Sequence, residues 1–248
     1  MHDLALILEL DVGNTAIKWR RLNGAVILDS GRITNELEGL KELVGAGVCL
    51  VRVASVAFAE REAELKALLV GAKVKYEFAV SQAECAGVRN GYDDVSRMGV
   101  DRWLAMLAAY NSCRDACVII DAGTALTIDA VGKDGQHHGG YILPGAGLAL
   151  RALEQSTGRV RFGIAESADT GLGKNTDACV HNGKWLGLVG AVKLALYEAE
   201  KQIGRHYKVL VTGGDGMNVK QLAGEYAESW HYSRDLVLDG LALALAKA

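Results

Sequence analysis

The feature that most constrains this chain is the stretch 118–131, which reads VIIDAGTALTIDAV. One apolar run ends in the carboxylate of Asp121, a turn with Gly123 and Thr124 follows, and a second β-rich run ends in Asp129. Short apolar runs bounded by turn residues are typical of covered strands. The stretch therefore predicts two buried strands joined by a tight turn.

The turn brings together groups suited to binding phosphate and cations. Gly123 lets the backbone approach a ligand closely, Thr124 offers a hydroxyl and an N–H, and a carboxylate can hold a cation. Residues 8–18, LELDVGNTAIK, repeat the pattern, since one strand ends at Asp11 and another departs after Gly13. Two such hairpins predict two similar half-domains that face each other across a nucleotide.

Composition argues against several other classes of protein. Half of the 248 residues are hydrophobic, and a formal net charge of -3 without a run of like charge argues against nucleic acid or an anionic membrane as the main partner. No apolar stretch approaches the roughly 20 residues of a membrane span, and the start does not resemble a signal peptide. The five cysteines lack metal-type spacing, so Cys113 and Cys117 are expected to serve packing. We expect a soluble cytoplasmic protein.

The first half of the sequence has the order of a ribonuclease-H-like fold. Strand patterns flank the Asp11–Thr15 turn, and Asn23-Gly24 is a strong hairpin signal. Three antiparallel strands followed by two parallel ones, with helices between, are the order of that fold. The expected strands are Ala5–Leu10, Ala16–Leu22, Ala25–Ile33, Val48–Ser55 and Val74–Phe78, and the expected helices are Glu36–Leu43 and Ala59–Leu69.

A helix that opens at Gly99 carries an unusual pair of charges. Asp101 in its first turn complements the helix dipole, which is a common structural role. Arg102 opposes the dipole there, which hints at an anionic ligand such as a carboxylate. Upstream, Tyr92 lies in a turn, either as an ordinary surface tyrosine or as a hydroxyl presented to a ligand.

The second half begins after a polar break at Asn111–Asp115. His137 and His138 are neighbours in a predicted strand and point to opposite faces, so the pair is not expected to chelate one metal ion. A strand over Lys208–Val211 ends in Gly213-Gly214, a close-approach site for a flat ligand such as adenine or its ribose. The other expected elements are helices over Leu148–Glu154, Thr176–Ala199 and Met217–Ala223, a short strand around Trp230 and a core helix over Asp235–Ala246.

A long loop over Thr157–Thr176 has no apolar period, and loops of this length are usually functional or mobile. Its end superficially resembles a P-loop. That motif requires a glycine where Ala168 stands, a serine or threonine where Asn175 stands, and a preceding strand. The sequence therefore predicts a helix cap at Asn175 or Thr176 instead.

Together the two turns predict a phosphoryl-transfer site. Their donors can cradle phosphate oxygens, their carboxylates can hold Mg²⁺, and Lys18 can add charge. Such a transfer depends on positioning and electrostatics, with one carboxylate orienting or deprotonating the acceptor hydroxyl. Asp101, beside Arg102, is the best candidate for that carboxylate. Two such turns followed by a strand and Gly-Gly are typical of the actin-like, acetate-and-sugar-kinase superfamily.

Within that superfamily the chain resembles the type III pantothenate kinases from end to end. Each motif alone is common, but the combination is specific, and no motif residue departs from the family's pattern. The matching segments are Asp11-Val12-Gly13-Asn14-Thr15 with Lys18, Tyr92, Gly99-Val100-Asp101-Arg102, Asp121-Ala122-Gly123-Thr124-Ala125 with Asp129, Gly139–Gly145 and Gly173-Lys174-Asn175-Thr176. The resemblance implies ATP-dependent phosphorylation of pantothenate, the first step towards coenzyme A.

The resemblance also implies the architecture of the chain. It implies an α/β fold with two ribonuclease-H-like (actin-like ATPase) domains, each a mixed sheet flanked by helices. Residues 1–114 would carry the first phosphate turn and the Gly-x-Asp-Arg helix. Residues 115–248 would carry the second phosphate turn and the adenosine-side Gly-Gly element.

Residue roles follow from the same resemblance. Asp101 would be the general base towards the pantothenate hydroxyl, and Asp121 would bind a monovalent cation, K⁺ or NH₄⁺. The pantothenate pocket would comprise Tyr92, Gly99, Val100, Asp101, Arg102 and Thr176. ATP with Mg²⁺ would be bound by Asp11, Val12, Gly13, Asn14, Thr15, Ala16, Ile17, Lys18 and Thr124. The family works as a homodimer with the substrate pocket near the subunit contact, so Thr176 could act across it.

Two other functions remain open. One is a small-molecule kinase of the same superfamily that acts, for instance, on a sugar; Tyr92 and the Gly-x-Asp-Arg helix argue against it. The other is a non-catalytic regulator or transcription accessory protein, a role assigned to some relatives. The sequence has no helix-turn-helix signal or basic stripe, and it keeps Asp101, which a decayed enzyme would be expected to lose.

Overall fold

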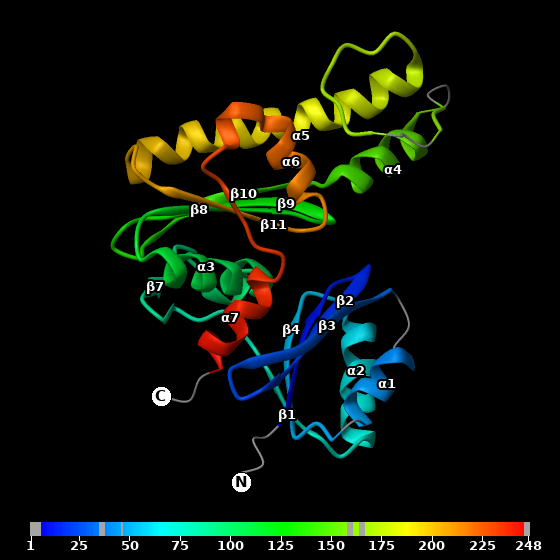
Figure 1. Ribbon diagram of the computed structural model, residues 1–248, viewed down its shortest axis with the longest axis vertical. Helices are drawn as coiled ribbons and strands as arrows, with labels where there is room; N and C mark the ends of the chain where they lie inside the picture. The colour runs from blue at the N-terminus through cyan, green and yellow to red at the C-terminus, as the bar shows by residue number, and fades with distance from the viewer. Residues whose placement is uncertain (1–5, 35–37, 46, 158–160, 164–166, 246–248) are drawn as a thin grey trace. The chain divides into compact units, whose positions relative to one another are not determined.

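The computed structural model describes residues 6–34, 38–45, 47–157, 161–163 and 167–245 (Figure 1). Its contacts divide the chain into two units. One runs to Ala108 and resumes at Leu236, and the other spans Ala109–Asp235. The expected boundary after residue 114 and the expected placement of the last helix in the second half both differ from this division. A chain that returns to its first unit leaves no mark in the local sequence pattern.

The first unit is built on a mixed sheet in the order β3-β2-β1-β4-β5. The β1, β2 and β3 strands pair antiparallel, whereas β4 and β5 join in parallel, as the sequence predicted. The strands are β1 (Leu6–Val12), β2 (Ala16–Asn23), β3 (Val26–Thr34), β4 (Leu50–Ser55) and β5 (Lys75–Phe78).

One face of this sheet is apolar and the other is polar. Helices α1 (Glu38–Gly45) and α2 (Ala59–Gly71) cover the apolar face (Figure 1). Because side chains alternate along a strand, Glu9 and Asp11 of β1 point to the opposite face. The apolar core consists of Leu8, Leu10, Val12, Ile17, Leu40, Val44, Val51, Val53, Leu65 and Leu69.

Between β5 and the third helix lies a small hairpin that the sequence did not predict. It consists of β6 (Glu84–Cys85) and β7 (Val88–Arg89), and a 3-10 turn, η1 (Val95–Arg97), follows it. Strands this short contain no periodic pattern, so hydrophobicity could not reveal them. Helix α3 (Val100–Cys113) comes next.

The second unit repeats the strand arrangement of the first. Its sheet has the order β10-β9-β8-β11-β12, with three antiparallel strands followed by two parallel ones. The strands are β8 (Cys117–Ala122), β9 (Ala125–Val131), β10 (His137–Pro144), β11 (Lys208–Thr212) and β12 (His231–Tyr232). This repetition confirms the expected pair of similar half-domains.

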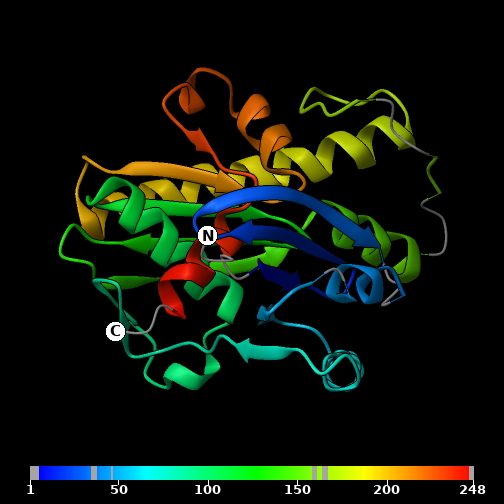
Figure 2. The same cartoon turned by 60° about the horizontal axis from the view of Figure 1, so that its bottom comes forward.

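Helix α5 (Thr176–Ile203) runs along one face of the second sheet (Figures 1 and 2). Its buried side chains recur at three- and four-residue spacing, as in an amphipathic helix, and include Trp185, Leu188, Val192 and Leu196. The other elements of this unit are α4 (Ala146–Ser156), α6 (Gly216–Ala223) and η2 (Gly224–Ala227). No helix in the described ranges is long and apolar enough to cross a membrane.

The last helix, α7 (Leu236–Ala244), contacts β1 and β4 of the first unit. Its side chains Leu236, Val237, Leu238 and Leu241 are buried, which confirms the expectation of a core helix.

Candidate active site

The first predicted phosphate turn is a tight hairpin between β1 and β2. The N–H of Gly13 donates to the carbonyl of Ala16 at 3.0 Å, and Asn14 and Thr15 form the exposed tip. This geometry presents backbone at the end of a rigid pair of strands, which suits a ligand that accepts N–H hydrogen bonds.

The side chain of Asn14 fastens the turn to the loop before α2. Its Nδ2 donates to the carbonyl of Val56 at 3.4 Å, and its Oδ1 accepts from the N–H of Phe58 at 2.9 Å. The N–H of Val56 donates to the carbonyl of Val12 at 3.1 Å. Asn14 therefore shapes the turn with its amide.

Strand alternation divides the predicted ATP-binding residues into two groups. The side chains of Val12 and Ile17 are buried in the core, so only their backbone can meet a ligand. Asp11 and Lys18 lie opposite each other across β1 and β2 on the polar face. A carboxylate and an ammonium so placed suit a metal ion and a phosphate group, respectively.

A buried charge network lies one step further along the same face. Arg20 donates from Nε to Glu9 at 2.7 Å and from one terminal nitrogen to Asp239 at 2.6 Å, and Arg52 donates to Glu9 at 3.3 Å. Burial lowers the pKa of Arg20, but the two carboxylates more than offset this and hold its pKa above the usual value. Arg20 therefore remains charged, and its bonds tie β2 to Glu9 of β1 and to Asp239 beside Asp11 and Lys18.

The structure brings Tyr92 and Arg102 together. The guanidinium of Arg102 donates to the Tyr92 hydroxyl at 2.6 Å and lies 5.5 Å from the ring centroid. Only 6% of Arg102 is exposed. The turn before it is held by Asn90, whose Oδ1 accepts from the N–H of Tyr92 at 3.0 Å. Tyr92 is thus the partner of an arginine rather than an ordinary surface tyrosine.

Asp101 folds back over the start of α3. Its Oδ1 accepts from the N–H of Arg102 at 2.7 Å, and a Cβ on Gly99 would lie only 2.7 Å from that oxygen. Gly99 therefore leaves room for the carboxylate. Val100 is 8% exposed, so its side chain serves packing. Asp101 therefore lies in the first turn of α3, where its charge complements the helix dipole, and its carboxylate lies beside the backbone of Arg102.

The second phosphate turn joins β8 to β9 and lies against two glycines. The N–H of Gly123 donates to the carbonyl of Ala125 at 2.9 Å, and the N–H of Gly145 donates to the carbonyl of Thr124 at 3.0 Å. A Cβ on Gly145 would lie 2.2 Å from the carbonyl oxygen of Gly123. Gly145, which opens α4, is therefore required for this close approach, and Thr124 is left exposed at the tip.

The predicted Gly-Gly element reaches the same turn from β11. Gly213 has a φ of +89°, and a Cβ there would lie 2.5 Å from Oδ1 of Asp121 and 2.4 Å from the carbonyl oxygen of Ala122. The N–H of Asp215 donates to that same carbonyl at 2.9 Å. Asp121 is thus surrounded by backbone from two strands.

The carboxylate of Asp121 lies beside the backbone of Gly213. No group of three or more His, Cys, Asp or Glu side chains that could hold a metal occurs among the residues that the structure describes. A cation there would depend on the carboxylate, backbone carbonyls, water and ligand oxygens. That donor set fits a hard cation such as K⁺ or Mg²⁺.

Lys184 and Asp215 add charge beside the Gly-Gly element, and sequence reasoning did not single them out. Burial lowers the pKa of Lys184 and raises that of Asp215, and their opposite charges counteract both shifts. They come from α5 and from the residue before α6, so only the folded second unit brings them together.

Thr176 is the first residue of α5, and Asn175 caps that helix. Oδ1 of Asn175 accepts from the N–H of Ala178 at 2.8 Å, which confirms the predicted cap. A Cβ on Gly173 would lie 2.3 Å from the backbone nitrogen of Cys179, so this loop is pressed onto the helix start. Thr176 itself is exposed.

The two histidines lie on opposite sides of β10, as expected. Nε2 of His137 lies 3.0 Å from Oδ1 of Asp129, and both side chains are buried. His138 is exposed. Asp129 of the second motif therefore supports the sheet interior rather than the turn.

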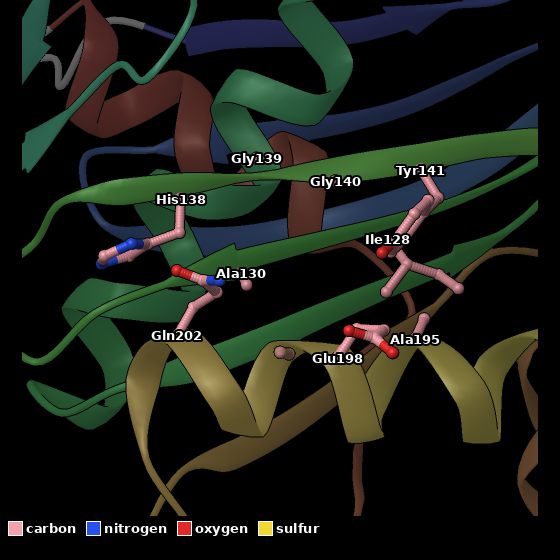
Figure 3. A pocket seen from close by; sticks show the side chains of 10 residues that line it. Ile128, Ala130, His138, Gly139, Gly140, Tyr141, Ala195, Glu198 and Gln202 are labelled. Atoms are coloured by element: carbon pink, nitrogen blue, oxygen red, sulfur yellow. The ribbon is translucent and has the colours of Figure 1, made fainter.

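A groove of about 460 Å³ lies between β10 and α5, away from the turn (Figure 3). Its walls include Ile128 and Ala130, which face α5, whereas Asp121 lies on the other face of the same sheet. The groove is therefore separate from the candidate active site.

Solved structures with a similar fold support the architecture. The chain matches the ethanolamine utilization protein EutJ from Carboxydothermus hydrogenoformans with a TM-score of 0.55 and 13% identity. The match covers 98% of this chain and 90% of that protein. It also matches component A of (R)-2-hydroxyglutaryl-CoA dehydratase from Acidaminococcus fermentans with a TM-score of 0.50 and 14% identity. That match covers 97% of this chain and 96% of the other. The fold is that of two actin-like α/β domains.

Sequence relatives identify the family. The type III pantothenate kinase family model matches residues 7–197. A type III pantothenate kinase from Pseudomonas fluorescens (strain Pf0-1) is 37% identical, over 96% of this chain and 98% of that protein. A type III pantothenate kinase from Marinobacter nauticus (strain ATCC 700491 / DSM 11845 / VT8) is 36% identical, over 95% of this chain and 96% of that protein. This chain belongs to the type III pantothenate kinase family.

Proposed function

We propose that this protein uses ATP to phosphorylate pantothenate to 4'-phosphopantothenate, the first step of coenzyme A biosynthesis. The observation that carries this proposal is the match to the family over residues 7–197, together with relatives that span nearly the whole chain. The proposed site residues lie in both of the units described above.

The ATP phosphates would bind at Asp11–Lys18 and at Thr124. The backbone of the first turn supplies N–H donors, and Lys18 supplies positive charge. Mg²⁺ bound with ATP would neutralise developing charge on the phosphates. Asp11 is the carboxylate on the polar face of this hairpin and is suited to hold it.

Pantothenate would bind at Tyr92, Gly99–Arg102 and Thr176. Its carboxylate needs a cation that is already oriented, and the guanidinium of Arg102 is held by the Tyr92 hydroxyl at 2.6 Å. Because Arg102 is almost fully buried, an ion pair there would be weakly screened by solvent.

Asp101 would act as the general base. Its carboxylate takes the proton from the primary hydroxyl of pantothenate as that oxygen forms a bond to the γ-phosphorus of ATP and the bond to the ADP oxygen breaks. Gly99 leaves space for this carboxylate, and the N–H of Arg102 orients it.

Asp121 would bind the monovalent cation, K⁺ or NH₄⁺. The support is the position of its carboxylate at the turn where Gly213 and the carbonyl of Ala122 meet. A cation there would add positive charge near the phosphates without a side-chain metal cluster.

The protein would act in the cytoplasm as a homodimer. Exposed apolar side chains in the second unit offer a contact surface: Tyr141 lines the groove of Figure 3 with 48% of its surface exposed, and Leu194 and Tyr197 on α5 are 61% and 57% exposed. Exposed apolar patches are typical of protein contacts. Thr176 could then complete the pocket of the partner subunit.

ADP release by purified protein tests the proposal, measured with and without pantothenate in buffers containing Na⁺ or K⁺. Turnover that requires pantothenate and K⁺ is expected. Pantothenate-dependent turnover in either buffer would keep the kinase and remove the cation site. No pantothenate-dependent turnover in any buffer would overturn the proposed function.

A further inference from the structure

Helix α7 contacts three separate parts of the first unit that carry or precede proposed site residues. These parts are strand β2, which carries Lys18, helix α3, which carries Asp101, and the hairpin that precedes Tyr92. The helix itself bears none of the residues proposed above. Each contact involves a different residue of α7 or its backbone.

The contact with β2 is a buried charged bond. Arg20 donates to Oδ1 of Asp239 at 2.6 Å and to the carbonyl of Leu238 at 2.8 Å, while Glu9 holds the same guanidinium from β1 at 2.7 Å. Arg20 is 4% exposed and Glu9 is 0% exposed. Arg20 lies two residues from Lys18 on the same face of β2, so α7 holds the strand that presents Lys18.

The contact with α3 is backbone against backbone. A Cβ on Gly240 would lie 2.1 Å from the carbonyl oxygen of Leu104. Leu104 comes less than one helical turn after Asp101. Because no side chain lies between them, Gly240 sets how closely α7 approaches the start of α3.

The third contact is weaker. Sγ of Cys85 lies 3.7 Å from the carbonyl of Leu243, at the other end of α7. Cys85 belongs to β6, and the chain then passes through β7 to Asn90, which orients the backbone of Tyr92.

We propose that α7 is a positioning element for phosphoryl transfer, and that Asp239 and Gly240 are its positioning residues. Asp239 fixes the strand of Lys18, and Gly240 fixes the helix of Asp101. Together they set the separation between the phosphate hairpin and the base. A displacement of reacting groups by about 1 Å can lower a rate roughly a hundredfold. This inference rests on the proposed function, because it concerns the same reaction.

A purely structural role for α7 predicts something different. Its buried leucines stabilise the unit in any case, so a structural role would lower the melting temperature and leave kcat of the folded enzyme unchanged. A positioning role lowers kcat at temperatures where the variant is fully folded, while KM for both substrates changes little.

The test uses Asp239→Asn and Gly240→Ala in the full chain. Each is expected to lower kcat roughly ten- to hundredfold. Asp239→Glu, which keeps the charge, is expected to recover part of the loss. Hydrogen exchange is expected to speed up at residues 11–18 in Asp239→Asn and at residues 99–105 in Gly240→Ala.

Two matched controls share the chemistry but not the position. Asp235→Asn removes an exposed ion pair with Arg234 just before α7, and Gly187→Ala adds a Cβ to a helix where nothing lies within 4 Å. Both are expected to keep wild-type kcat.

The outcomes separate this inference from the proposed function. Wild-type protein without pantothenate-dependent turnover would overturn the proposed function, and the exchange measurement would still decide the role of α7. Folded variants with wild-type kcat, or with wild-type exchange at both segments, would overturn the role of α7.

Discussion

Asp101 has two roles to reconcile at the scale of single residues. Its carboxylate accepts from the N–H of Arg102 at 2.7 Å, which stabilises the helix start, and the proposed reaction requires it as a base. Asp101→Asn keeps an acceptor oxygen for that N–H but cannot take a proton. We expect kcat to fall roughly 10²- to 10⁴-fold, with pantothenate binding largely retained in calorimetry. Near-normal kcat would remove Asp101 as the base.

Arg102 should contribute to binding rather than to the chemical step. Its guanidinium is buried beside Tyr92, and a charge-assisted hydrogen bond contributes about 1.5–3 kcal/mol. We expect Arg102→Ala to raise KM for pantothenate roughly 10- to 150-fold, which is the same energy expressed as affinity. Tyr92→Phe, which removes only the hydroxyl that orients Arg102, should have a smaller effect in the same direction. An unchanged KM in Arg102→Ala would leave that residue a structural role only.

Cys113 should be the most reactive thiol at neutral pH. A hydrogen bond from the Cys117 side chain lowers the pKa of Cys113 to about 6, and the same interaction together with burial raises the pKa of Cys117. The thiolate of Cys113 therefore forms as pH rises through about 6, and its alkylation rate should rise there rather than near the usual value of about 8.5.

The control for this prediction is Cys117→Ala, which removes the donor at a buried position of β8. The midpoint of the Cys113 alkylation profile should then move to higher pH, as read by mass spectrometry of the labelled peptide. A profile that is the same in both proteins would contradict the proposed thiol pair.

At the scale of elements, the second phosphate turn depends on glycines that the backbone approaches closely. Gly145 is the clearest case, because its φ of -71° is ordinary and only space forbids a side chain. A Cβ there would lie 2.2 Å from the carbonyl oxygen of Gly123, so Gly145→Ala must displace α4 or the turn. We expect a loss of about 1–3 kcal/mol in the free energy of unfolding, together with a higher KM for ATP.

Chemical denaturation with an ADP-release assay measures both effects. Gly183→Ala is the matched control, since it lies in α5 with nothing within 4 Å of the added Cβ, and alanine favours a helix by about 1 kcal/mol over glycine. Equal stability of the two variants would contradict the close approach at Gly145.

The elements also show what sequence could reveal and what it could not. The strand–Asp–Gly turns at 8–18 and 118–131 predicted the β1–β2 and β8–β9 hairpins, because apolar runs and turn residues are local signals. The helix cap at Asn175 could be predicted for the same reason, because its signal lies within a few residues of the chain. No local signal showed the unit to which α7 belongs, since a Leu- and Ala-rich helix does not indicate which sheet it covers.

The missed site residues have the same explanation. Glu9 interrupts an apolar strand, which was a visible signal, but its partners Arg20 and Asp239 are recognisable only after folding. Arg20 and Asp239 are 219 residues apart in sequence. Lys184 and Asp215 also come close only through the packing of α5 against α6.

At the scale of the whole molecule, the proposed dimer connects surface and site. Tyr141 lines the groove in the second unit, and Leu194 and Tyr197 expose apolar surface on α5. A charge on that surface would have to be desolvated on association, so Leu194→Lys should convert a dimer into a monomer in sedimentation experiments. Val70→Lys, which replaces an apolar residue of α2 that is 62% exposed, should leave the dimer intact.

The same variant then decides where Thr176 acts. If Thr176 completes the pocket of the partner subunit, monomeric Leu194→Lys lacks that hydroxyl in its own pocket and should lose pantothenate-dependent turnover, although its fold is unchanged. Activity should return when the protein concentration is raised enough to restore the dimer, because association is a mass-action equilibrium. A monomer with wild-type kcat and KM would place Thr176 in its own subunit's pocket. A wild-type protein that sediments as a monomer would remove the dimer itself.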